Sequence, residues 1–270
     1  MTMQLYLYGI IDSIEPITES LYGLEGASIC NVPFRDIGAI VSEISRPIEE
    51  ATEGAVLEHE AVAEGMMAVR TVLPVRFGTI IDGRDNLLSM MQDYYGQFKE
   101  NLDRLRDKFE FGVKVIWPGN KVKGNIVTAF KKSGQKMPGA GGSAAARFMK
   151  EKFREHRIDE EFKARAGRFV KIVDIFFGRF AAEEKVEKLK TENLLVDAVY
   201  LVEKDKIHDF REAFEHIRSA HPNLKYLFSG PWPAYNFVVL SKRPGLLGDP
   251  TRACLLDKTS SRQDLVGVDC

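Results

Sequence analysis

The sequence has few cysteines and no long apolar run. Its 270 residues include three widely spaced cysteines, Cys30, Cys254 and Cys270. An odd, scattered set without a CxxC pair predicts neither a disulfide framework nor a zinc site, and favours a reducing cytoplasm. The longest apolar stretch begins at Ile172, contains Asp174 and Arg179, and is too short to span a bilayer. The first ten residues lack the charged and apolar segments of a signal peptide, so we expect none.

The chain also lacks an excess of charge of either sign. Its formal net charge is −1, with 44% hydrophobic and 29% charged residues, which is ordinary for a globular protein. We therefore expect neither nucleic acid nor a membrane as a partner. The charges are nevertheless uneven, because residues 43–64 are rich in acids and residues 121–179 are rich in bases. Such runs are either solvated faces or surfaces that guide assembly with partners or neighbouring copies.

The first part of the chain alternates strands with helices. Strands are predicted over 4–11, 27–32, 37–44 and 71–81, and a helix over about 55–70. The next helix is marked by apolar residues spaced at threes and fours: Leu88, Met91, Tyr95, Phe98, Leu102, Leu105 and Phe109.

The second part begins with an alternating strand over 109–117. A Lys-, Gly- and Ala-rich connection, partly helical, follows over 118–146, and then a long helical region over 144–190. Further predicted elements are a strand over 194–204, a helix over 205–221, and strands over 223–230 and 235–240. The pattern predicts an α+β protein with two domains and a tail. These are an N-terminal mixed domain over 1–108, a ferredoxin-like domain with a long helix over 109–240, and an extended C-terminal tail over 241–270.

No motif of catalysis or cofactor binding is complete. His59 and Glu60 begin like the zinc-protease helix HExxH, but Ala63 stands where the second histidine is needed, which favours a satisfied, partly buried His59. The segment Gly134–Gly139 resembles a phosphate loop without the required Lys and Ser or Thr, and a flexible linker explains it better. His208 and His216 are two helical turns apart, too far to share a metal. We therefore predict no catalytic residue, cofactor or metal.

One strand offers a candidate surface for a partner. In TVLPVRFGTI, the residues Pro74, Arg76 and Gly78 point to one face, which is small and carries a single charge. Pro74 cannot donate to a ladder and favours a sheet edge. Arg76 either binds a carboxylate or carbonyl of an approaching chain, or pairs with Asp36 or Asp82 within the fold.

The stretch GPWPAYNFVV, residues 230–239, has two prolines around a tryptophan. Residues before proline favour extended backbone, so we expect a rigid crossover between a strand ending at Ser229 and one starting near Tyr235. Trp232, Tyr235 and Phe237 are expected to fill the core beneath it.

Several of these segments together resemble one family. YLYGI, LEHEAV, TVLPVRFGTI, FEFGVKVIW and GPWPAYNFVV occur in the order found in gas vesicle accessory proteins F and L. The resemblance covers most of residues 4–240 and is weakest over 118–146 and the long helix. It implies a fold of two α+β domains and a non-enzymatic role as a minor structural or assembly protein, located at gas vesicles in the cytoplasm.

The resemblance also implies partners. They are the major gas vesicle shell protein, which is small and apolar, and other gas vesicle accessory proteins. We predict that Pro74, Arg76 and Gly78 contact the shell protein. Two other functions stay open on the residues alone: a ferredoxin-like ligand-binding or regulatory module, and a metal hydrolase that uses His59 and Glu64.

Overall fold

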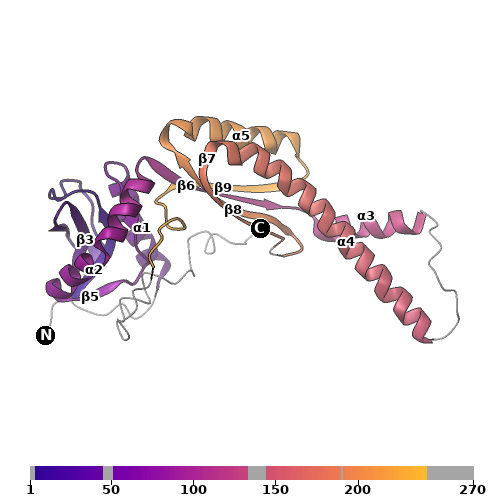
Figure 1. Cartoon of the computed structure of the whole chain (residues 1–270), viewed down its shortest axis with the longest axis horizontal. Helices are drawn as coiled ribbons and strands as arrows, with labels where there is room; N and C mark the ends of the chain where they lie inside the picture. The colour runs from indigo at the N-terminus through magenta and orange to yellow at the C-terminus, as the bar shows by residue number, and fades with distance from the viewer. Residues whose placement is uncertain (1–3, 45–50, 133–143, 190, 242–270) are drawn as a thin grey trace. The chain divides into compact units, whose positions relative to one another are not determined.

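The computed structural model describes residues 4–44, 51–132, 144–189 and 191–241. Over these ranges the chain contains two antiparallel sheets and helices (Figure 1), which confirms the predicted α+β class. It divides into two compact units: the described parts of Met1–Glu110 with Pro231–Cys270 form the first, and Phe111–Gly230 form the second. The predicted boundaries at 108 and 240 stay a prediction, and the predicted tail over 241–270 lies almost wholly outside the described residues. No helix in the described ranges is long and apolar enough to cross a membrane.

The first unit is a sheet of five strands with helices on it. Its elements are β1 (Gln4–Ile11), η1 (Leu24–Gly26), β2 (Ile29–Phe34), β3 (Ile37–Ile44), α1 (Glu53–Met67), β4 (Val72–Pro74), β5 (Ile80–Asp82) and α2 (Gly83–Leu105). The strand order is β2-β3-β1-β4, and β5 also pairs with β1. The predicted bounds of β1 and β3 are confirmed.

Strand β1 lies at the centre of this sheet and is buried on both faces. Tyr6 and Tyr8 belong to a core cluster with Val62 and Met66 of α1. Leu5 and Leu7 point to the other face, because side chains alternate along a strand, and they are buried as well. Helix α2 also contacts β1.

The prediction of one strand over 71–81 is wrong in one respect, because the structure has two short strands there. β4 pairs with Gly9–Ile11 and β5 pairs with Gln4–Tyr6 of the same neighbour, β1. Between them, residues 75–79 leave the ladder; we call them the strand break. Pro74 has no N–H for a ladder, and Gly78 adopts a φ of +83°, which glycine tolerates.

The second unit has the strand order of a ferredoxin-like fold. Its elements are β6 (Lys108–Ile116), α3 (Gly119–Lys132), α4 (Ala144–Phe177), η2 (Gly178–Phe180), β7 (Ala181–Lys188), β8 (Leu194–Glu203), η3 (Lys204–Lys206), α5 (Ile207–Ala220) and β9 (Lys225–Trp232). The sheet order is β7-β8-β6-β9, so the first and third strands of the unit are central. This order confirms the predicted ferredoxin-like arrangement.

Aromatic side chains fill the core between this sheet and its helices. Phe210 of α5 lies with its ring centroid 5.1 Å from that of Phe177 and 5.3 Å from that of Phe111. Tyr200 of β8 packs on Phe177 at 5.4 Å. All four side chains are fully buried, so the packing of α4 and α5 on the sheet rests on them.

Two predictions in the second half are wrong. The long helical region ends at Phe177 instead of 190, and β7 follows; its sequence, AAEEKVEK, has too few apolar residues to show as a strand. Charged side chains suit β7 because it is an edge strand. The predicted strand over 235–240 does not exist, and β9 instead continues through Pro231 to Trp232. Proline is tolerated there because β9 is the other edge of the sheet.

Candidate partner-binding site

The three predicted site residues lie at the edge of the first sheet, Pro74 at the end of β4 and Arg76 and Gly78 within the strand break. Pro74 is buried and pairs with Gly9, whereas Arg76 and Gly78 are partly exposed. The break keeps its ends on β1 through two backbone bonds. The amide of Leu7 donates to the carbonyl of Thr79 at 2.9 Å, and the amide of Val75 donates to the carbonyl of Tyr8 at 3.3 Å.

A buried histidine holds the break from beneath. His59 of α1 lies with Nε2 3.0 Å from the carbonyl oxygen of Val75 and with Nδ1 2.9 Å from the hydroxyl of Tyr6. A carbonyl only accepts, so Nε2 carries the proton and Nδ1 accepts from Tyr6. The Tyr6 oxygen in turn accepts from the amide of Gly78 at 2.9 Å. One hydrogen-bonded chain therefore joins both halves of the break to β1 and α1.

Burial keeps His59 neutral. It lowers the pKa of the imidazole to about 4, although the bond to Val75 acts in the opposite direction. Phe77, the central residue of the break, joins the same cluster with its ring centroid 5.8 Å from that of His59. Phe77 therefore anchors the break in the core, while its neighbours Arg76 and Gly78 remain partly accessible.

This geometry decides the role of His59. Both ring nitrogens are used in hydrogen bonds, so neither is available to a metal, which contradicts the hydrolase based on His59 and Glu64. Nor do the described ranges contain any group of three His, Cys, Asp or Glu side chains that fits a metal. The residues Gly134–Gly139 lie outside the described ones. His208 pairs with Glu212, and His216 stacks on Phe176.

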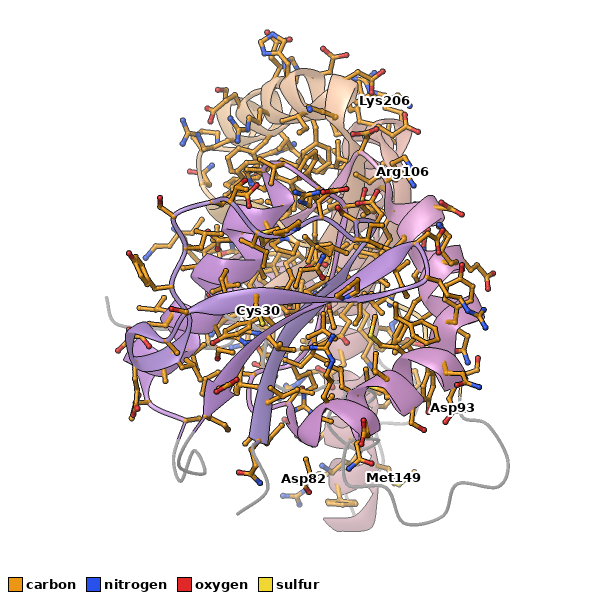
Figure 2. The ribbon with its side chains drawn as sticks, turned by 90° about the vertical axis from the view of Figure 1, so that its left-hand side faces the viewer. Cys30, Asp82, Asp93, Arg106, Met149 and Lys206 are labelled. Carbon is orange, nitrogen blue, oxygen red and sulfur yellow. The ribbon has the colours of Figure 1, made fainter. Side chains whose placement is uncertain are left out.

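The two carboxylates considered as partners of Arg76 have partners elsewhere in the first unit. Asp36 accepts from the hydroxyl of Tyr95 and pairs with Lys99 at 2.9 Å, and these bonds lower its pKa to about 2. Asp82, at the end of β5 (Figure 2), accepts from the side-chain amide of Gln4 at 2.8 Å.

A second feature was missed from the sequence. Residues 233–241, which we call the strap, continue from β9 and lie on the first unit. Asn101 of α2 donates to the carbonyl of Val239 at 2.8 Å and accepts from its amide at 2.9 Å. Gln97, one turn earlier, makes the same pair of contacts with Ser241. The side chains of α2 thus bind the backbone of an extended segment at every second residue.

The start of the strap is fixed just as closely. Glu110, which is buried, accepts from the backbone amide of Asn236 at 2.8 Å and from its side-chain amide at 2.6 Å. Phe237 is buried as predicted, and its carbonyl accepts from Arg104. The hydroxyl of Tyr235 is buried, which raises the pKa of this phenol far above its ordinary value. Asn101 was the available signal, because it is a polar residue within an apolar helical stripe.

Comparison with known proteins identifies the family of this chain. The model of the family described as "Gas vesicle synthesis protein GvpL/GvpF" matches residues 4–239. Gas vesicle protein F2 of Halobacterium salinarum is 28% identical over 87% of this chain and 91% of its own length. Gas vesicle protein F of Nostoc sp. is 26% identical over 89% of this chain and all of its own length.

Solved structures show the same fold. The crystal structure of GvpF from Anabaena sp. PCC7120 has a TM-score of 0.77 at 22% identity, covering 90% of this chain and 100% of that one. The structure of GvpF from Microcystis aeruginosa has a TM-score of 0.73 at 20% identity, covering 88% and 99%. Because the family model covers nearly the whole described chain, this protein belongs to the gas vesicle synthesis protein GvpL/GvpF family.

Proposed function

We propose that this protein is a non-catalytic accessory protein that binds the gas vesicle shell protein through the strand break, and that other accessory vesicle proteins are further partners. The accessory role rests on membership of the family. We expect the protein to act at gas vesicles within the cytoplasm, because its relatives are gas vesicle proteins.

One observation carries the choice of site: the break is an interruption of an edge strand that the fold holds rigidly. β4 and β5 form the edge of the first sheet beyond β1. An edge strand offers backbone groups to another extended chain. The chain His59–Tyr6–Gly78 fixes the break in advance, so little conformational entropy is lost on binding. Arg76 adds a positive, multidentate donor beside these backbone groups.

The role follows from the chemistry of the partner. A small apolar shell protein must be kept from aggregating before it assembles. Transient pairing with a preformed edge would cover part of its apolar surface without a permanent complex. A catalytic site is not required for this task.

The test is a pull-down of the shell protein with the variant Arg76→Glu. We expect loss of at least about tenfold in affinity, because the charge at the contact is reversed. The melting temperature should stay nearly unchanged, since Arg76 is partly exposed. Arg168→Glu, an exposed arginine of α4, makes the same charge change elsewhere and should bind normally. Normal binding by Arg76→Glu would reject the assigned site.

A further inference from the structure

The first half of α4 exposes large apolar side chains. Phe148 is 62% exposed, Met149 66% and Phe153 51%. Every residue over 147–157 is exposed, and Met149 lies near the start of the helix (Figure 2). Met149 and Phe153 are four residues apart and share one helical face. A group of exposed aromatic and Met side chains on one element indicates a surface that another molecule covers.

The same region is strongly basic. Helix α3 and residues 147–157, which together we call the basic arm, contain nine basic residues and two acidic ones. The two helices contact each other, and the guanidinium of Arg157 lies 5.8 Å from the centre of the Phe130 ring. Both acids are already paired within α4, Glu151 with Arg154 and Glu155 with Lys152. Lys123 also pairs with Asp159 and Glu192 outside the arm, and the remaining bases still leave the arm with a positive excess.

Helix α1 of the first unit has the opposite character. It contains four glutamates and no lysine or arginine. Its exposed residues form a face that we call the acidic face: Glu53, Gly54, Leu57, Glu58 and Ala61. Leu57 is 42% exposed, and a side chain added at Gly54 would meet nothing within 4 Å. The acidic face thus contains one exposed leucine and two small residues, Gly54 and Ala61, which leave room for bulky side chains.

We propose that the basic arm of one copy of this protein docks on the acidic face of a second copy. The two surfaces are opposite in charge, and the arm has bulky side chains where the acidic face has small residues. Phe148, Met149 and Phe153 would cover Leu57, and the small residues at 54 and 61 would accept the aromatic rings. Lysines and arginines around them would face Glu53 and Glu58.

This contact is heterologous, because different surfaces meet. Each copy in a pair keeps one unused arm or one unused acidic face. Further copies therefore add head to tail, and the series ends only if its geometry closes a ring. The inference is independent of the strand break, since it uses other residues and a different partner.

The experiment is sedimentation of the full chain with charge-reversed variants. Wild-type protein should self-associate with rising concentration, and should do so less in 1 M than in 0.1 M salt, since the screening length falls from about 10 Å to about 3 Å. The arm variant Lys150→Glu with Arg154→Glu should associate at least about tenfold more weakly, and so should the face variant Glu53→Lys with Glu58→Lys. Mixing the two variants should restore association, because each reversed surface then meets its complement.

Controls separate the contact from misfolding. Arg218→Glu with Lys225→Glu reverses two exposed charges outside the arm and should associate like wild type. Glu58 accepts a bond from the amide of Glu25 at 2.9 Å, so Ala61→Lys tests the acidic face without removing that bond. Each variant should melt near the wild-type temperature, except Glu53→Lys with Glu58→Lys, which loses the bond to Glu25.

Three results would overturn the proposal. One is a chain that stays monomeric at every concentration. Another is association that neither reversal weakens, or that mixing fails to restore. The third is a monomer whose arm binds vesicles of anionic phospholipid instead.

Discussion

Lowering the pH should destabilise the protein through one group, His59. This imidazole has a folded pKa of about 4, below the ordinary 6.5, because it is buried. A depressed pKa means that the unfolded chain binds more protons between pH 6.5 and 4, so the free energy of unfolding falls as the pH falls through that window. The two pKa values correspond to a loss of about 2 kcal/mol between pH 7 and pH 5, and about 3 kcal/mol when the shift is fully used.

The assay is urea denaturation followed by circular dichroism at pH 7, 6 and 5. Carboxylates also titrate as the pH falls, so wild type is compared with His59→Gln, in which those other groups are unchanged. The variant should be less stable at pH 7, because Gln lacks the ring that packs on Tyr8 and Phe77, and its flexible side chain must be ordered to reach both Tyr6 and Val75. The difference between the two proteins should shrink by about 2 kcal/mol towards pH 5. A difference that stays constant with pH would refute the neutral, doubly bonded histidine.

Two further predictions concern the bonds to the strap and the aromatic core of the second unit. Asn101→Leu removes both bonds to Val239 at similar volume, so the free energy of unfolding should fall by about 2 kcal/mol in urea denaturation; an unchanged midpoint would show that these two bonds contribute nothing. Phe177→Ala empties the centre of the aromatic core of the second unit and should cost about 3–5 kcal/mol by the same measurement, whereas the half-buried Phe176 should tolerate Leu within about 1.5 kcal/mol. Equal losses at 176 and 177 would contradict the assigned faces of α4.

Local sequence patterns predicted the strands that are buried among apolar neighbours. β1 and β3 are short, mostly apolar runs bounded by turn residues, so their limits could be read from the sequence. The ferredoxin-like arrangement was expected from alternating strands and helices, although the expected succession lacked β7 and contained a strand over 235–240 that does not exist. β7 could not be recognised, because an edge strand gains its stability from pairing with β8 and not from burial of its own side chains.

The candidate site was predictable as a short segment but not as a structure. Pro74, Arg76 and Gly78 are neighbours in the sequence, and their small, singly charged face was visible there. Tyr6 and His59, whose hydrogen bonds hold these residues in place, are distant in the sequence and lie 53 residues apart. Hydrogen bonds across such separations leave no periodic signal. The strap was missed for the same reason, since its partners on α2 lie 138 and 144 residues away.

The return of residues 231–241 to the first unit has a consequence for biosynthesis. The ribosome releases the strap only after all 120 residues of Phe111–Gly230 have emerged, so the second unit can fold before the first has its last segment. Until then Gln97, Asn101 and Glu110 have no strap to bind, and the core position of Phe237 stays unfilled. The unit made first is therefore completed last, and a chain that stops within the second unit leaves the first one incomplete.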